Sequence, residues 1–281
     1  MLKFSENLEK LIQERTSWRT YKSKSLKSGD KTPLINSFQE VCQNLPFDSS
    51  IRFDLISVSE VQAQLRRKLG TYGFISGAKD FIISAYEKSP TGAHDIGYAF
   101  EQLILKATDL GLGTCWLGGT FKRSNFAELI DIQPSERLPA ISPVGYMKSR
   151  NLKGKIIRRF AHAKHRKSWD ELFFYDSFNT SLDPEQAQKL QQPLEWVRLA
   201  PSGGNKQPWR VLVDSHTNHV HFFIDRAGLT PKNGYWHTQQ LDIGIAMCHF
   251  ELGCRSNNIT GKWIVKSEVN SDYKVPSSYE Y

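Results

Sequence analysis

The sequence has few cysteines and no long apolar run. Its four cysteines, Cys42, Cys115, Cys248 and Cys254, show no paired metal-ligand spacing, and none lies in a CxxC. We therefore expect free thiols in a reduced, cytoplasmic setting and no metal site. The longest apolar runs are far too short to cross a bilayer, and the first nineteen residues lack the apolar core of a signal peptide. These absences argue against a membrane partner.

Hydrolytic and nucleic-acid signatures are also missing. The eight histidines are scattered, and no Ser-His-Asp spacing or acidic pair suggests hydrolysis. The net charge of +8 permits a nucleic-acid partner, and the densest basic run covers residues 153–169. The basic residues are not interleaved with aromatics in any RNP-like or helix-turn-helix pattern, and sites where bases could stack are absent. The run could equally be a solvated basic face or hold one small phosphate, so we expect no nucleic-acid partner.

What the 281 residues do contain is a weak internal repeat. Residues 94–116 and 241–263 each begin with Asp-Ile-Gly after one residue and end in Trp, and the Trp lies 21 positions after the Asp in both. In the first copy, apolar residues recur at three and four residues, which predicts a buried helix. The N-terminal residues Leu2, Leu8, Leu11 and Ile12 also recur at roughly helical spacing, which predicts an amphipathic helix.

Strand candidates flank both copies of the long helix. They cover residues 51–58, 80–86 and 136–146 in the first half and 209–214, 219–225 and 262–269 in the second. The repeated order predicts an α+β fold of two halves, with mixed, largely antiparallel sheets flanked by helices. We expect halves at residues 1–175 and 176–281, divided in the polar stretch 175–184, that form an intramolecular pseudo-dimer in a monomeric chain.

Three segments carry candidate binding chemistry. Arg15, Ser17 and Arg19 alternate after the first helix, and alternate residues of an extended segment point the same way. Two guanidinium groups and a hydroxyl on one side suit a terminal phosphate, although a polar connection with two surface arginines explains them as well. The glycines of "GLGTCWLGG" (111–119) follow a helix rather than a strand, which disfavours a Rossmann loop. A helix C-cap explains Gly111 or Gly113 in part, whereas Gly118 and Gly119 let backbone N–H groups approach a planar ligand.

The third segment is "LAPSGGNKQPWRVLV" (199–213). Asn205 and Gln207 offer neutral donors and acceptors, which suit the edge of an uncharged heterocycle better than a metal or a phosphate. Ser202 and the adjacent glycines allow an unusual backbone path. An ordinary loop is the alternative.

Together these motifs resemble the FMN-dependent nitroreductase superfamily, in its single-chain, two-half "putative TM nitroreductase" branch. "RTSWRTYKSKSL" resembles the family's R-x-S-x-R motif, "APSGGNKQPW" resembles S-x-x-N-x-Q-P-W, and "LGLGTCWLGGTF" resembles L-G-L-G-T-C-W-x-G-x-F. "VGYMKSR…KHRKSWDELF" resembles the family's G-Y segment and later K-x-R. The resemblance extends from Phe4 to Trp263.

The resemblance implies a role for each residue. Arg15 and Ser17 would hold the FMN phosphate together with Lys164 and Arg166, and Arg19 would lie near N1 and O2 of the flavin ring. The backbone of Gly118 and Gly119 would approach N5. The remaining family positions would line the ring edge or ribityl chain and are Ser202, Asn205 and Gln207.

The halves depart from the family pattern in opposite ways. The second half reads "ELFFYDSFN" where the first half has Arg15 and Arg19. The first half has "NLPFDSSIRF" in place of the segment that carries Asn205 and Gln207, called the amide loop below. Only one complete site can then form, so we expect one FMN per chain. The implied activity is ping-pong hydride transfer from NAD(P)H through flavin N5 to a nitroaromatic, quinone or other small electron-poor acceptor, with no protein general base. The alternative is a flavin-binding or sensor protein with little turnover.

Overall fold

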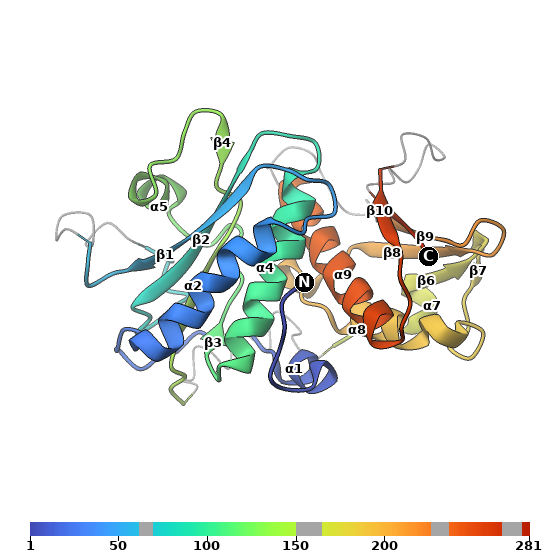
Figure 1. Ribbon diagram of the computed structural model, residues 1–281, viewed down its shortest axis with the longest axis horizontal. Coiled ribbons are helices and arrows are strands. Elements are labelled where there is room, and N and C mark those ends of the chain that lie inside the picture. Colours follow the sequence, from blue (N-terminus) through green and yellow to red (C-terminus); the bar gives the residue numbers. More distant parts are fainter. Residues whose placement is uncertain (62–69, 150–164, 226–235, 266–276) are drawn as a thin grey trace. The chain divides into compact units, whose positions relative to one another are not determined.

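The computed structural model describes residues 1–61, 70–149, 165–225, 236–265 and 277–281 (Figure 1). Their contacts divide the chain into two compact units. The first unit is Met1–Asn44, Ser49–Gly92 and Phe100–Ala163, and the second is Leu45–Asp48, Ala93–Ala99 and Lys164–Tyr281. The main division lies between residues 163 and 164, earlier than the expected 175/176, and two short segments of the N-terminal half cluster with the second unit.

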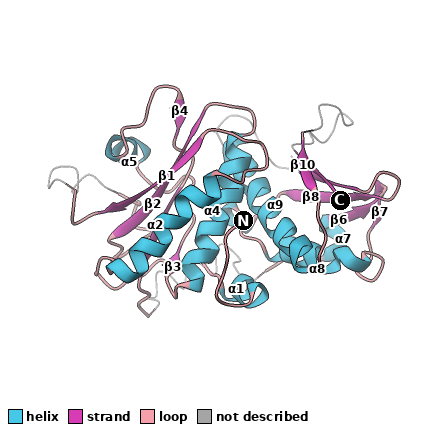
Figure 2. Ribbon diagram, viewed as in Figure 1, coloured by secondary structure: helices cyan, strands magenta, loops and turns pink. Residues whose placement is uncertain are grey.

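The first unit contains an antiparallel sheet covered by helices (Figure 2). Its strand order is β1-β2-β5-β3, with the short β4 pairing with β2. The strands are β1 (Ile51–Ser57), β2 (Asp80–Glu87), β3 (Gly113–Thr114), β4 (Glu136–Arg137) and β5 (Ile141–Gly145), and the helices are α1 (Leu8–Glu14), α2 (Ser28–Cys42), α4 (Gly92–Asp109, of which Ala93–Ala99 belong to the second unit) and α5 (Arg123–Leu129).

Aromatic contacts explain why this sheet is buried on both faces. Phe53 of β1 packs against Phe38 of α2 and Phe100 of α4, with ring centroids 5.9 and 5.3 Å away. Figure 1 shows α2 and α4 side by side on this face. On β2, Phe81 packs 5.4 Å from Phe126 of α5. The predicted strands at 51–58, 80–86 and 136–146 are therefore present, the last as two short strands.

Two helix ends depart from or refine the sequence expectation. The N-terminal helix begins at Leu8 rather than Leu2, because the Asn7 side chain caps it by accepting the N–H groups of Glu9 and Lys10. Just after the C-terminus of α4, Gly111 adopts a left-handed conformation with φ of 70°. It therefore ends α4 as a C-terminal glycine does.

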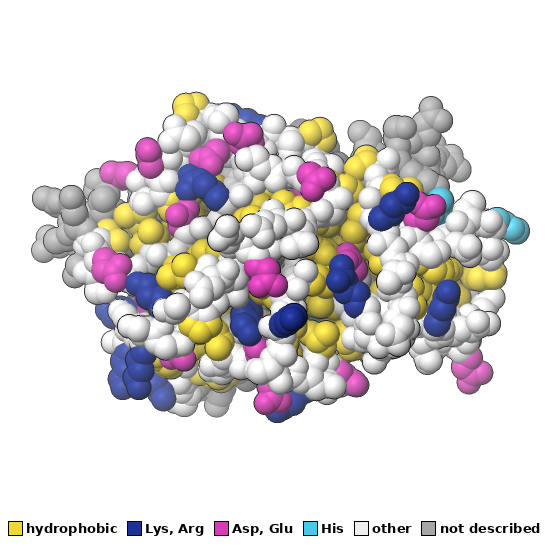
Figure 3. Space-filling view, in the orientation of Figure 1, with side chains coloured by type: hydrophobic (Ala, Val, Ile, Leu, Met, Phe, Trp, Pro, Cys, Tyr) yellow, Lys and Arg dark blue, Asp and Glu magenta, His cyan; other side chains and the backbone are white. Residues whose placement is uncertain are grey.

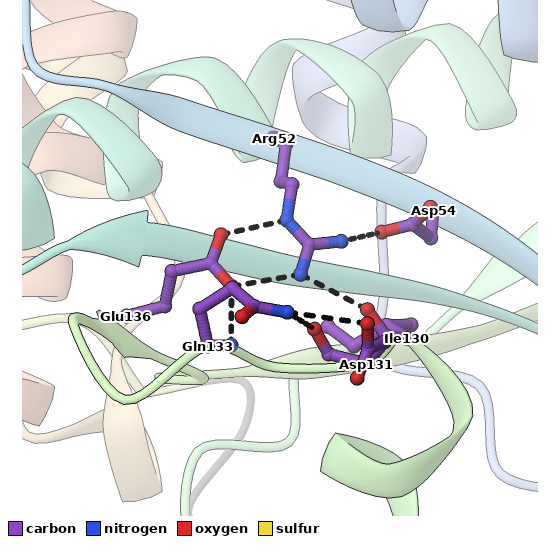
Figure 4. A network of polar contacts seen from close by, with 6 residues as sticks. All are labelled: Arg52, Asp54, Ile130, Asp131, Gln133 and Glu136. Atoms are coloured by element: carbon purple, nitrogen blue, oxygen red, sulfur yellow. Dashed lines mark hydrogen bonds and ion pairs between the residues drawn. The ribbon is translucent and has the colours of Figure 1, made fainter.

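A charged cluster fixes the loop between α5 and β4 to the sheet (Figure 4). Arg52 of β1 donates from Nε and Nη2 to both carboxylate oxygens of Glu136, at 2.7 and 2.9 Å, and from Nη1 to Asp54 at 2.7 Å. Its Nη2 also reaches the Ile130 carbonyl at 3.0 Å. Because the N–H of Gln133 donates to Glu136 as well, one arginine joins β1, β4 and the end of α5.

The second unit is built on a six-stranded sheet in the order β10-β11-β9-β8-β6-β7. Its strands are β6 (Phe173–Tyr175), β7 (Ser177–Ser181), β8 (Trp209–Asp214), β9 (His219–Ile224), β10 (Lys262–Ile264) and β11 (Ser277–Glu280), and its helices are α7 (Trp169–Leu172), η1 (Gln188–Leu190), α8 (Gln191–Leu199), η2 (Gly203–Asn205) and α9 (Trp236–Ser256). The β6–β8 pair is parallel and the other pairs are antiparallel. Phe250 of α9 packs 5.4 Å from both Phe222 and Tyr279 of this sheet.

Three strands of the second unit were not predicted. Residues 173–181, expected in part as a polar boundary, form β6 and β7, and the C-terminal residues form β11 between β9 and β10. The predicted strand at 262–269 forms β10 over Lys262–Ile264, and residues 266–269 lie outside the described residues. Backbone pairing with neighbouring strands explains why such polar segments are extended.

The two Asp-Ile-Gly sequences meet within the second unit. A Cβ atom on Gly97 would lie 2.2 Å from the Leu241 carbonyl oxygen, and one on Gly244 would lie 2.0 Å from the His94 carbonyl oxygen. The Cβ position on each glycine would also fall within 3.0 Å of the other glycine's Cα atom. The contact is reciprocal, because positions 94 and 97 in one repeat face 241 and 244 in the other. The glycines are thus required by close backbone approach.

None of the helices in the described ranges is long and apolar enough to span a membrane. On the face drawn in Figure 3, Lys and Arg side chains are mixed with Asp and Glu rather than gathered into a patch of one sign.

Candidate functional site

In the first unit, the arginine motif is bound to the glycine-rich segment after α4. Ser17 forms a parallel bridge with Thr114, and the Trp18 N–H donates to the Thr114 carbonyl at 2.7 Å. A Cβ atom on Gly113 would lie 2.7 Å from Met147 Cγ and 3.0 Å from Trp18 Cβ. The segment that carries Arg15, Ser17 and Arg19, called the arginine arm below, covers Gly113, which explains why position 113 is a glycine. The arm and the glycine-rich segment form one local structure.

The arm holds two guanidinium groups with unused donors. The Arg15 side chain is only 8% exposed, and its Nε lies 3.7 Å from Oε1 of Glu101, which is beyond hydrogen-bond distance. Neither Arg15 nor Arg19 makes a side-chain hydrogen bond to any part of the chain that the structure describes. Buried polar groups are nearly always hydrogen-bonded, so Arg15 is suited to a further anion.

Arg15, Ser17 and Arg19 all act on the pKa of the buried Cys115 thiol. Burial raises the pKa of Cys115, while Arg19, a hydrogen bond from Ser17 and Arg15 all act to lower that pKa. That Arg15, Ser17 and Arg19 share one side of an extended segment stays a prediction.

Gly118 and Gly119, the other two glycines of the predicted site, lie a few residues after Gly113 and Thr114. The Gly118 carbonyl accepts a hydrogen bond from Arg123 Nη2 at 2.8 Å. A Cβ atom on Gly119 would meet no described protein atom within 4 Å, so packing against the described residues does not explain this glycine.

In the second unit, the loop before β8 has a compact and strained backbone. Gly204, Asn205 and Gln207 all have left-handed φ angles, of 60°, 58° and 48°. The Gln207 N–H donates to Ser202 Oγ at 2.9 Å, which closes the loop on itself. The Gly203 N–H donates to Asp242 Oδ1 of α9, also at 2.9 Å.

The amides of this loop bind the basic segment that precedes α7. Asn205 accepts from Arg166 Nη1 at 3.0 Å and donates to the His165 carbonyl at 2.8 Å. Gln207 is 1% exposed, and its Oε1 accepts the Lys167 N–H at 2.9 Å. The structure therefore brings Arg166, Ser202, Asn205 and Gln207 together, but it uses the two amides to hold residues 165–167. Lys164 lies outside the described residues.

Asp242 is a buried carboxyl that sequence reasoning missed. Burial raises its pKa to about 8, although the Gly203 N–H and the charge of Lys206 act in the opposite direction. The matching Asp95 accepts the Phe47 N–H at 3.1 Å, and Phe47 belongs to the "NLPFDSSIRF" stretch that replaces the amide loop in the first half. The repeated aspartate was visible in the sequence, but only as a marker of the repeat.

A second missed carboxylate is Glu101, which is fully buried in α4. Its Oε2 accepts the Trp116 Nε1–H at 2.7 Å. A glutamate within the apolar stretch "YAFEQLILKA" is the sequence signal that could have found it. Among the residues described, no group of three His, Cys, Asp or Glu side chains could hold a metal ion.

Comparisons with known proteins agree with the arrangement of motifs. The family model described as "Putative TM nitroreductase" matches residues 7–254. Among curated proteins none matches.

A solved structure that matches nearly the whole chain shows the same fold. The crystal structure of a "putative nitroreductase" from Thermotoga maritima covers 99% of this chain and 95% of its own, with 17% identity and a TM-score of 0.63. An FMN complex from Desulfovibrio desulfuricans covers 54% of this chain and 96% of its own, with 20% identity and a TM-score of 0.42. An FMN-dependent nitroreductase from Clostridium difficile covers 50% and 88%, with 19% identity and a TM-score of 0.39. With its nitroreductase-like α+β fold and a family match over most of its length, this chain belongs to the "Putative TM nitroreductase" family.

Proposed function

We propose that this protein is an FMN-dependent oxidoreductase that uses NAD(P)H to reduce nitroaromatics, quinones or similar electron-poor small molecules. The observation that carries the proposal is the buried, incompletely paired Arg15 beside Arg19 in the family's phosphate motif. When bound, FMN supplies a ring that accepts a hydride at N5 and passes it to a second substrate in a ping-pong cycle.

The described residues fit this cofactor by their donor chemistry. Arg15 and Ser17 would bind the terminal phosphate, since guanidinium groups bind phosphate oxygens in pairs. The family's basic segment would add Arg166 and Lys164, of which Lys164 lies outside the described residues. Arg19 would place a fixed positive charge near the ring, where charge accumulates on reduction. The open space at Gly119 is consistent with a ligand approaching the backbone of Gly118 and Gly119.

The amide loop is proposed to act in part through the residues it holds. Asn205 fixes Arg166, and Gln207 fixes the backbone of Lys167. Ser202 sets the loop conformation through the Gln207 N–H. We propose that the outer surface of this loop borders the ring edge, as the family motif implies.

We propose one FMN per chain in a monomeric pseudo-dimer. The two halves would derive from a duplicated unit, which the reciprocal contact between Gly97 and Gly244 supports. Only the first half carries the arginine arm and only the second carries the amide loop. A titration that saturates at two equivalents of FMN would refute the single site.

Flavin binding and turnover are tested on the purified full-length protein. We expect flavin absorption bands, saturation at one equivalent of FMN, and NADH or NADPH oxidation that depends on menadione or nitrofurazone. Arg19→Ala should weaken FMN binding, whereas Arg198→Ala, which removes an arginine paired with Glu195, should not. A protein that takes up no FMN would refute the proposal, and FMN binding without acceptor-dependent turnover would favour a sensor.

A further inference from the structure

Each unit contains a tryptophan whose indole donates to a buried glutamate of a long helix. Trp116 Nε1 donates to Glu101 in the first unit, and Trp263 Nε1 donates to Glu251 in the second, both at 2.7 Å. These tryptophans are the last residues of the two sequence repeats. The two glutamates differ in which arginine they meet.

In the second unit, the carboxylate is saturated by neighbouring donors. Glu251 accepts the Tyr98 hydroxyl at 2.8 Å, and it accepts Nε and Nη2 of Arg255 at 3.0 and 2.9 Å. Arg255 lies one turn further along the same helix, and its side chain is 57% exposed. The Arg255 guanidinium therefore uses its Nε and Nη2 donors on Glu251, and both residues belong to the same helix.

In the first unit, the pair is looser and more deeply buried. Glu101 is 0% exposed, Arg15 is 8% exposed, and the atoms that approach each other are Oε1 and Nε, 3.7 Å apart. Arg15 comes from the segment after α1, 86 residues before Glu101 in the sequence. Its remaining donors reach no acceptor in the described part of the chain. A buried guanidinium with one loosely held side is costly unless an anion completes its hydrogen bonds.

We infer that Glu101 is a positioning residue for cofactor binding: it holds the Nε side of Arg15 so that the Nη1–Nη2 edge binds the terminal phosphate of the flavin. The inference rests on the proposed function and adds a residue outside the three motifs. Trp116 fixes the other carboxylate oxygen of Glu101 and so orients the pair. Phosphate is favoured because its oxygens match the spacing of two guanidinium N–H groups.

The test compares FMN with riboflavin, which lacks the phosphate. Dissociation constants of the apo-protein for both are measured by flavin fluorescence, and their ratio reports phosphate recognition. In Glu101→Gln, the single amide oxygen is retained by the Trp116 indole, so the amide NH₂ faces Arg15 and displaces it. We expect the ratio of the riboflavin and FMN dissociation constants to fall about tenfold, which corresponds to losing one charge-assisted hydrogen bond between Arg15 and the phosphate. The affinity for riboflavin should stay unchanged.

Two further variants separate positioning from a general structural effect. Glu251→Gln removes the equivalent carboxylate of the second unit and should leave the ratio unchanged. In an Arg15→Met background, Glu101→Gln should cause no further fall, because its effect passes through Arg15. If Glu101→Gln does not fold, Trp116→Phe frees the Oε2 atom while keeping the carboxylate, and it should lower the ratio about threefold.

The outcomes are distinct. An unchanged ratio in Glu101→Gln, or a stronger preference for FMN because a competing negative charge is gone, would overturn the inference while leaving the proposed function intact. An equal fall in Glu251→Gln, or in both Arg15 backgrounds, would overturn it as well. A wild-type protein that binds neither flavin would overturn both the inference and the proposed function.

Discussion

The buried Asp242 should make the stability of the protein fall as the pH rises. Burial raises its pKa from 3.8 to about 8 in the folded chain. The unfolded chain therefore releases this proton at lower pH than the folded chain. The stabilisation is complete below the unfolded pKa, and it decreases until the pH has passed the folded pKa. Between these limits each pH unit costs about 1.36 kcal/mol.

The substitution Asp242→Asn should remove this dependence. Asparagine mimics the protonated carboxyl, and its Oδ1 can still accept the Gly203 N–H that fixes the loop. From pH 5 to pH 8 the wild type loses about 4 kcal/mol through this residue, three units at 1.36 kcal/mol each. The variant should therefore gain about 4 kcal/mol over the wild type across that range, and little more above pH 9.

Urea unfolding at pH 5, 7 and 9, followed by tryptophan fluorescence, measures the difference. Asp170→Asn is the matched control, because it removes the same charge from an exposed position in the second unit. That variant should track the wild type at every pH. If the stability difference between Asp242→Asn and the wild type is the same at pH 5 and pH 9, Asp242 is ionised in the folded protein throughout, and the reasoning from burial is wrong.

Three further predictions concern the frame of the site. Gly113→Ala should displace the arginine arm, weaken FMN binding and lower the melting temperature. Gly119→Ala, where a Cβ would meet no described atom, should leave the melting temperature unchanged. Equal shifts in melting temperature for the two variants would refute the close-packing argument. Arg52→Met should lower the free energy of unfolding by about 2 kcal/mol, because Glu136 loses a bidentate partner at a partly exposed site; urea unfolding checks this, and a neutral result would show that the Figure 4 cluster adds nothing. Gly244→Ala should cost about 3 kcal/mol by calorimetry, since its Cβ would collide with a backbone carbonyl, and an unshifted melting temperature would contradict that collision.

Periodicity predicted the elements that depend on local sequence. Strands β8 and β9 and the long buried helices α4 and α9 appear where apolar spacing indicated them. Alternation also predicts that Arg15, Ser17 and Arg19 lie on one side of their segment, and this stays a prediction. Strands β6, β7 and β11 were not predicted by this route, since β6 and β11 join the sheet through β8 and β9, which are distant from them in the sequence.

The candidate site was predictable only as a set of motifs. Local spacing could not reveal that Asn205 and Gln207 are engaged with residues 165–167, because these contacts join segments about forty residues apart. Glu101 and Asp242 were missed for a related reason. A single acidic residue in an apolar helix has no periodic partner, and its role depends on a side chain or N–H group from elsewhere in the fold.

The reciprocal glycine contact also constrains how the sequence can vary. Each Asp-Ile-Gly helix fills with its own backbone the space that a side chain of the other would need. A larger residue at position 97 is tolerable only if the backbone near 241 withdraws, and that withdrawal opens space at 244 as well. Positions 97 and 244 are therefore expected to be substituted together in related chains, because the residue that fits at one depends on the backbone position at the other.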